Sequence, residues 1–589
     1  MNITIPVNRF TSGEISPKLA ALINTEIYDS SLRTLENFVV TNQGTLRRRP
    51  GSYFLSETSG NYTVVFHEFR STSGEYFMLE FTAVFVRFRK EDGDLLRDSS
   101  DIPIGFPVPY QEHELKELRV AVADNAIWIA HRNHTVRKIT YTPGSPGSFV
   151  LSEPTFTGGR TFNAVGDYPG VICFYAGRLF LASTTNEPSA IFASRPYDST
   201  TGNPRYTDFD FGSANPQAND AIMLQEKDLL GSNLLWLLPQ RRLIAATTKT
   251  TWMSDDNPPM PDTFDMNVQS FNGSADIQAR LADNIVAYVG RDNVSLRICA
   301  FSNEAGGLID RNISKAAEHI LKKGIVSIAV QTIPETVIWV SLKDGTFASC
   351  LIDIEEGIIA WSRHSMQNGF VEHLNVLAKA DGDDLYLCVR RYIKGTPKRY
   401  VEVIHLSELE LEKEEEHFID CGIRLVGKEG YEIISGLNFL DGETLSYLSN
   451  GAVKAPVAVT SGITTVKIDK DNSVVHIGLP IESRILFKHL ETPANGTSQG
   501  KNKKIEKVTL RVYESRGGHM GQFLNKLRPL LYERYGEIIF GDTPNPFTGD
   551  VEIDFQGTTD KKPDMWIVTA EPVNFHLLGA FIKVNICEV

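Results

Sequence analysis

The chain has 589 residues and a formal net charge of −14, with 42% hydrophobic and 22% charged residues. This is the composition of a folded protein, and the length indicates two to four domains because one hydrophobic core does not grow to this size. The acidic balance excludes a protein that grips nucleic acid over a large basic surface, and no apolar run approaches the roughly 18 residues of a membrane-spanning helix.

Three short blocks stand out near the N-terminus. They are Phe10–Leu19, reading FTSGEISPKL, Leu32–Phe38, reading LRTLENF, and Gln43–Gly51, reading QGTLRRRPG. The proline after Ser16 suits the first turn of a short helix, where its missing N–H is not needed. The Pro-Gly pair that ends the third block predicts a turn before a strand at Ser52–Leu55.

The third block contains a cationic cluster, Arg47, Arg48 and Arg49. Guanidinium groups are bidentate donors, so the cluster is suited to carboxylate, phosphate or carbonyl partners. One interpretation is a contact with another protein. The other is a solvated strand end whose charges serve solubility.

The middle of the chain repeats one pattern, in which two alternating or β-branched runs flank a short turn. Each repeat predicts a β-hairpin. The pairs are Val64–Arg70 with Tyr76–Arg89, Val120–Ala123 with Ala126–Ala130, Arg178–Ser183 with Ala190–Ser194, Leu243–Thr247 with Thr250–Ser254, Ile285–Val289 with Val294–Ala300, Val337–Leu342 with Thr346–Ile352, and Val376–Ala380 with Leu385–Arg391.

The spacing of these hairpins is loosely that of four-stranded propeller blades, about 40–50 residues. Closing the blades into a ring would cover most strand edges, as a chain with so many short hairpins requires. We therefore predict a mainly β protein with a β-propeller of six or seven blades over residues 61–405. A stack of β-sandwiches is the alternative.

The remaining segments predict smaller units. Residues 1–60 and 505–589 are expected to form a mixed N- and C-terminal platform. Residues 406–418, which contain the run SELELEKEEEHF, predict a charged helix or linker with a solvated face. Residues 419–504 predict a small all-β tip domain that ends in a mobile polar loop, ANGTSQGKNKK at Ala494–Lys504.

The cysteines and tryptophans predict core positions. The tryptophans Trp128, Trp252, Trp339 and Trp361 fall within predicted strands. The six cysteines are isolated in sequence and form no CxxC pair, so buried free thiols are expected. They are Cys173, Cys299, Cys350, Cys388, Cys421 and Cys587.

The sequence predicts no catalytic, cofactor or metal site. His131 and His134 have a spacing seen in metal sites, but two residues of one strand at this spacing point to opposite faces, and no third ligand is near in sequence. Asp381–Asp384 and Asp469–Asn472 are better explained as hairpin turns than as calcium loops. Phosphate-loop, GxSxG and HExxH motifs are absent, and nothing singles out a glycosidase pair among the many carboxylates.

The three N-terminal blocks, in this order, resemble the signature of the tail nozzle proteins of short-tailed bacteriophages, also called tail tubular protein B or stabilization protein. That signature has an SGE-hydrophobic-SP opening, then RTLENF, then a glycine turn and RRPG. The chain departs from it at Thr45-Leu46, where the family usually has two small residues. The segments Lys507–Glu514 and Phe547–Val551 resemble blocks of the family's C-terminal part.

The resemblance implies a propeller and a structural function rather than an enzyme. It implies a homohexameric ring around a channel at the distal end of the tail, bound to the portal adaptor and bearing tail fibres or tailspikes. The ring would retain packaged double-stranded DNA and pass it without specific binding during ejection, with no stable membrane insertion. It would belong to the virion after assembly in the host cytoplasm. In this context Arg47, Arg48 and Arg49 are expected at the adaptor interface.

A second hypothesis is a carbohydrate-active or receptor-binding propeller of a phage tail, because propellers often hold glycans in their central channel. The oligomeric state separates the two. A closed, wide ring supports the conduit, whereas a monomer or trimer that cleaves glycans supports the alternative.

Overall fold

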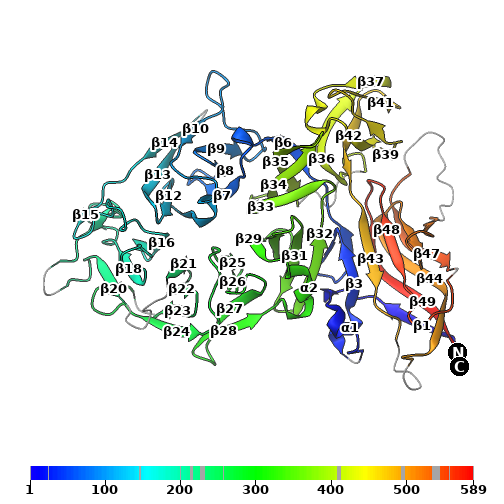
Figure 1. Ribbon diagram of the computed structural model, residues 1–589, viewed down its shortest axis with the longest axis horizontal. Coiled ribbons are helices and arrows are strands. Elements are labelled where there is room, and N and C mark those ends of the chain that lie inside the picture. The colour runs from blue at the N-terminus through cyan, green and yellow to red at the C-terminus, as the bar shows by residue number, and fades with distance from the viewer. Residues whose placement is uncertain are drawn as a thin grey trace.

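The computed structural model describes residues 2–587 except residues 24, 145–146, 199, 213–215, 226–232, 256–257, 407–412, 492–497, 533–543 and 556. Its regular structure is almost entirely β-strand (Figure 1). No helix among the described residues is long and apolar enough to cross a bilayer. The helical turns are α1 (Glu26–Asp29), α2 (Glu318–Leu321) and the 3-10 turns Pro17–Leu19, Ser59–Asn61, Leu115–Glu117, Lys315–Ala317 and Leu437–Leu440.

Seven four-stranded units surround a common centre (Figure 1). Most are built from strands that follow one another along the chain. In order they are β7 (Val65–Arg70), β8 (Tyr76–Thr82), β9 (Phe85–Lys90) and β10 (Gly105–Pro107); β11 (Arg119–Ala123), β12 (Ala126–His131), β13 (His134–Thr142) and β14 (Ser148–Ser152); β16 (Val171–Tyr175), β17 (Arg178–Ala182), β18 (Ala190–Ala193) and β20 (Ile222–Gln225); β21 (Leu234–Pro239), β22 (Leu243–Thr247), β23 (Thr251–Ser254) and β24 (Met266–Ser270); β25 (Arg280–Ala282), β26 (Ile285–Val289), β27 (Leu296–Ser302) and β28 (Gly307–Asn312); β29 (Ile325–Gln331), β30 (Val337–Leu342), β31 (Phe347–Asp353) and β32 (Ile358–His364); and β33 (Gly369–Leu377), β34 (Asp384–Ile393), β35 (Thr396–His405) and β6 (Tyr53–Glu57).

The last unit closes the ring. Its fourth strand, β6, precedes β7 in sequence, and its first strand, β33, lies between β29 and β7. The first and last parts of the propeller are therefore held in one blade, which covers edges that a row of hairpins would leave open. The prediction of a β-propeller is confirmed, with seven blades in the described chain.

Local sequence explains the hairpins. Asp124 and Asn125, which join β11 to β12, both have left-handed backbone angles, with φ of 49° and 57°, as a type I′ turn requires.

The expected single strand at Tyr76–Arg89 is instead two strands, β8 and β9. The chain reverses at Ala83 and Val84, and Val84 has a φ of 59°. No glycine or proline marks that turn in the sequence.

A small domain extends the seventh blade outward. β36 (Ile419–Gly427) pairs in parallel with β6 and carries the sheet on to β42 (Ser473–Pro480) and β38 (Thr444–Ser449). Its core includes Val466 and Ile477, and Tyr400 of the propeller joins it. The remaining strands are β37 (Gly430–Ile434), β39 (Ala452–Val453), β40 (Val457–Ala458) and β41 (Thr464–Ile468).

The platform consists of two sheets, each built from both ends of the chain (Figure 1). The second of them continues the sixth blade through β32, and both share a core that includes Phe38, Ile485 and Ile582. The first sheet holds β1 (Asn2–Val7), β4 (Phe38–Val40), β5 (Leu46–Arg48), β49 (His576–Cys587), β44 (Asn502–Ser515) and β47 (Phe547–Asp554); the second holds β2 (Gly13–Glu14), β3 (Ser31–Glu36), β43 (Ser483–Phe487), β48 (Trp566–Thr569), β45 (His519–Gly521) and β46 (Arg528–Pro529). A short parallel pair, β15 (Thr157–Gly158) with β19 (Asp208–Phe209), lies outside these units.

Several expected boundaries differ from the structure. β6 lies in the propeller rather than in the N-terminal platform, and β43 lies in the platform rather than in the tip domain. Residues 413–418 contain no helix, whereas residues 407–412 of the expected charged segment and 494–497 of the expected loop lie outside the described residues. Strand patterns identify a strand but not its partner, which explains the first two differences.

Candidate functional site

The residues of the N-terminal blocks meet where the platform, the propeller and the small domain join. We call Gly13, Glu14, Asn37, Arg48, Arg49 and Gly51 the signature junction. The side chains of Glu14, Arg48 and Arg49 are at most 1% exposed. The three-way contact therefore depends on polar groups that are shielded from water.

Arg49 links the signature to the small domain. Its Nη1 and Nη2 donate to Oδ1 and Oδ2 of Asp420 at 3.0 and 2.9 Å, and both side chains are fully buried. Ser52 then donates to Glu402 at 2.6 Å, and Glu402 pairs with Arg391 of the seventh blade at 2.8 Å. Burial acts to lower the pKa of Arg391, but the Glu402 carboxylate overcomes this and raises it above its usual value.

Arg48 links the signature to the C-terminal platform. It donates to Ser483 Oγ at 3.0 Å, to the carbonyl of Val573 at 2.9 Å and to that of Glu571. Burial, and then the neighbouring Arg49, lower the pKa of the Arg48 guanidinium to about 9. The lowering is consistent with a guanidinium held largely by neutral carbonyl dipoles rather than by a paired carboxylate.

These contacts correct the interpretation of the arginine cluster. Arg48 and Arg49 form neither a docking surface nor a solvated strand end, because both are 0% exposed. Arg47 is 15% exposed and lies 3.6 Å from Glu335 of the propeller. Sequence analysis missed the partners because Asp420 and Val573 are hundreds of residues away.

The other signature residues have equally specific positions. A Cβ at Gly51 would lie 2.0 Å from the Ile419 carbonyl oxygen, and one at Gly13, whose φ is +58°, would lie 2.3 Å from that of Trp361. Glu14 accepts hydrogen bonds from the Leu35 N–H at 2.6 Å and from His319 at 2.8 Å. The glycines and the acid of the signature are thus required by close packing.

A cavity of about 380 Å³ lies on the propeller axis, because residues from the first strands of all seven blades line it. We call it the axial cavity. It contains Glu68 and Arg280. Burial raises the pKa of the Glu68 carboxyl, whereas Arg280 acts in the opposite direction.

A second cavity of about 340 Å³ shares Gln278 and Arg280 with the first. We call it the cationic cavity. Its lining carries one carboxylate, which is paired with Arg119. Lys116 and Lys343 form no ion pair among the described residues, so the lining has an excess of positive charge. Its charged residues are Lys116, Arg119, Arg280, Lys343 and Asp276.

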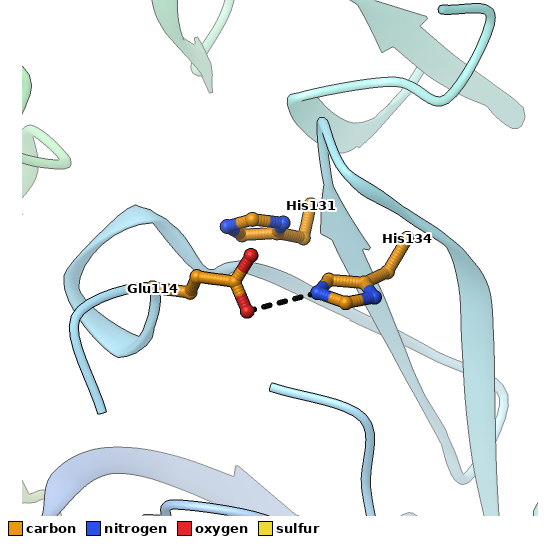
Figure 2. A group of neighbouring side chains, drawn as sticks. All are labelled: Glu114, His131 and His134. Carbon is orange, nitrogen blue, oxygen red and sulfur yellow. Dashed lines mark hydrogen bonds and ion pairs between the residues drawn. The ribbon is translucent and has the colours of Figure 1, made fainter. Parts of the chain in front are cut away.

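A third candidate site combines His131 and His134 with Glu114 (Figure 2). The expectation that the two histidines point apart is wrong. His131 ends β12, His134 begins β13, and the two residues pair across the hairpin. Glu114 comes from the connection between the first two blades, and its Oε2 lies 2.9 Å from His134 Nε2.

The other predicted positions agree with structural roles. The four tryptophans of the sequence analysis are buried, and so are the five described free cysteines, from Cys173 to Cys421. In the Asp381–Asp384 segment, Asp384 pairs with Lys379 and His405 at 2.9 and 2.7 Å. Its carboxylate is therefore engaged by cationic or polar side chains of the protein.

No family model matches the chain, and no curated protein matches its sequence. Similar solved structures include the RRP9 WD40 repeats, with a TM-score of 0.38 and 11% identity over 61% of this chain and 99% of that one. U3-55K has a TM-score of 0.37 and 12% identity over 61% and 100%. Virginiamycin B lyase from Staphylococcus aureus has a TM-score of 0.35 and 10% identity over 59% and 96%. At these identities the likeness concerns the fold alone.

Proposed function

We propose that the chain is a structural subunit of the tail nozzle of a short-tailed bacteriophage. Six copies form the distal DNA conduit, which retains the packaged genome and passes it during ejection. The observation that carries the proposal is the signature junction. The residues through which the sequence resembles nozzle proteins are the buried contacts that hold the platform, the propeller and the small domain together.

A signature of this kind supports a shared architecture rather than a shared surface charge. Gly13 and Gly51 admit no side chain, and Arg49 needs Asp420 as its partner. Proteins with the same signature therefore have reason to join the same three parts in the same way.

The termini add a second line of support. β1 pairs with β49 along its whole length, so the chain leaves the platform, forms the propeller and returns to the same sheet. One end of the molecule therefore contains both termini (Figure 1). We propose that this platform binds the portal adaptor and that the propeller projects from the ring, where fibres or spikes attach.

The test is the symmetry of the assembly. The purified protein is mixed with its adaptor, and the complex is studied by mass measurement and averaged electron-microscope images. We expect a closed six-fold ring with the platform against the adaptor. A stable two-fold or three-fold assembly would contradict the proposal.

The cationic cavity favours a second candidate function, a receptor-binding propeller. Lys116 and Lys343 are exposed cationic groups in a concave site near the axis, which suits an anionic sugar. A monomer or trimer that binds or cleaves a charged glycan would support this alternative. The two functions are compatible if the nozzle ring also contacts the host surface.

A further inference from the structure

The structure brings three metal-ligand side chains together from two separate segments. His131 and His134 flank the two-residue turn between β12 and β13, and Glu114 approaches from the preceding connection. One ligand atom from each residue lies within 4.8 Å of the other two. Figure 2 shows both imidazole rings facing the Glu114 carboxylate.

One of these groups has an unsatisfied polar atom. His131 is 0% exposed, and its Nε2 has no hydrogen-bond partner; the nearest carboxylate oxygen, of Glu117, is 3.8 Å away. The other ring nitrogen accepts a 3.2 Å hydrogen bond from the Asn133 N–H. Buried polar atoms normally have partners, so this orphan nitrogen is open to one. A metal ion binds Nε2 in the tautomer that carries the ring proton on Nδ1, and that tautomer gives up the hydrogen bond from the Asn133 N–H.

We propose that Glu114, His131 and His134 bind one divalent transition-metal ion, with Zn²⁺ as the best match. Two imidazoles and one carboxylate are a known zinc ligand set, and they leave a coordination position for water. Ca²⁺ and Mg²⁺ do not fit as well, because they prefer ligand sets made of oxygen atoms.

The surroundings provide support for the ligands and a route of entry. Asn133 Nδ2 donates to Glu114 Oε1 at 3.2 Å, and the Gln111 N–H donates to Oε2 at 2.9 Å, which fixes the carboxylate. The side chains of His134 and Glu114 are 21% and 11% exposed, so an ion can reach them from solvent. A bound ion would join the connection after the first blade to the hairpin of the second.

The experiment uses the full-length protein after treatment with a chelator. Zn²⁺ is titrated by calorimetry, and thermal unfolding is recorded with and without Zn²⁺. Co²⁺ serves as a spectroscopic probe of coordination. We expect one Zn²⁺ per chain, a higher Tm with Zn²⁺ because the metal binds the folded state, and visible Co²⁺ absorption typical of four-coordinate nitrogen and oxygen ligands.

The variants test which residues bind. H134Q and E114Q keep the size of the side chain, and each should weaken Zn²⁺ binding at least about tenfold and remove the Co²⁺ signal. H113Q is the matched control, because His113 is an exposed neighbour outside the cluster. Circular dichroism and the Tm without metal show whether each variant is folded. Zn²⁺ binding that is absent in the folded wild type, or unchanged in a folded H134Q variant, would overturn the proposal.

Discussion

The signature junction and the cationic cavity both contain arginines within the same chain, but they use them differently. At the junction, Arg49 is fully buried and bound by Asp420 through two hydrogen bonds. In the cavity, Arg119 is paired with Asp276, whereas Lys116 and Lys343 have no ion pair among the described residues. The arginine cluster of the signature resembles a charged surface in the sequence, but Arg48 and Arg49 are buried contacts inside the molecule. The lysines without an ion pair line the cationic cavity instead.

The difference shows that the charged residues of a sequence do not reveal by themselves whether they are buried in ion pairs or exposed to solvent. Removing one partner of a buried ion pair leaves an uncompensated charge, whereas removing an exposed charge changes stability little. Stability and binding should therefore respond in opposite ways at the two sites. The predictions below test that contrast.

The largest effect is expected for D420N, which leaves the Arg49 guanidinium buried without a carboxylate. We expect the free energy of unfolding to fall by about 3–5 kcal/mol. Urea denaturation followed by fluorescence measures the change. D550N is the control, because its pair with Arg511 is 42–53% exposed and is therefore expected to contribute little to stability. Equally small losses in both variants would show that the junction does not depend on this pair.

A pH effect should come from His476, which is fully buried in β42 of the small domain. Burial lowers its pKa to about 4, whereas in the unfolded chain the value is about 6.5. Between these two pKa values the unfolded state binds more protons than the folded state, so the free energy of unfolding falls as the pH drops from about 6.5 towards 4.

The histidine effect is measured by urea denaturation at pH 7, 6 and 5. In H476Q the slope of the unfolding free energy against pH should decrease by up to about 1.4 kcal/mol per pH unit. H113Q is the matched control, because it removes an exposed histidine. A slope that is the same in wild type and H476Q would exclude His476 as a source of acid sensitivity.

In the cavity, the double variant K116Q/K343Q should change the free energy of unfolding by no more than about 0.5 kcal/mol. It should nevertheless weaken binding of a sulfated oligosaccharide, and salt should weaken the remaining binding further. The matched control K428Q/K467Q removes two exposed lysines from the small domain. An equal loss of binding in both double variants would indicate an effect of net charge alone.

The smallest effect is expected for DNA. Six copies carry six times −14, or −84 formal charges, so the assembled ring should not form the many cation–phosphate contacts that make proteins adhere to duplex DNA. We expect binding weaker than about 10⁻⁶ M at physiological salt, with a shallow salt dependence, and retention of DNA by a steric constriction. Tight binding with a steep salt slope in a filter-binding series would contradict a ring that passes DNA without binding it firmly.

The sequence predicts the propeller because its blades are local. Each hairpin, such as β11 with β12, is encoded by alternating residues around a turn whose Asp124 and Asn125 adopt left-handed angles. The closing strand is not local. β6 has the composition of any strand, and nothing in its residues indicates that β35, hundreds of positions later, is its partner.

The same limit applies to the candidate sites. The sequence shows His131 and His134 three positions apart, but the expectation that both lie in one strand places their side chains on opposite faces. The third residue of the cluster, Glu114, lies in a different segment of the chain. The turn residues Arg132 and Asn133 were the signal that a hairpin separates the two histidines. The partners of Arg48 are mainly backbone carbonyls, which every residue possesses, so no sequence pattern could have identified them.

The pairing of β6 with β35 closes the propeller, and the pairing of β1 with β49 completes a platform sheet. Both pairings also determine the order in which parts of the protein can fold. During synthesis, β6 leaves the ribosome long before β35, and β1 waits for β49, in which Asn585 pairs with Asn2. The strands between them can form hairpins as they emerge, but the ring cannot be completed before β35 has been made, nor the platform before β49 has been made. Contacts of such long range fold slowly. A chain truncated before β49 would thus leave β1 without its partner strand, so the platform depends on the synthesis of β49 for its completion.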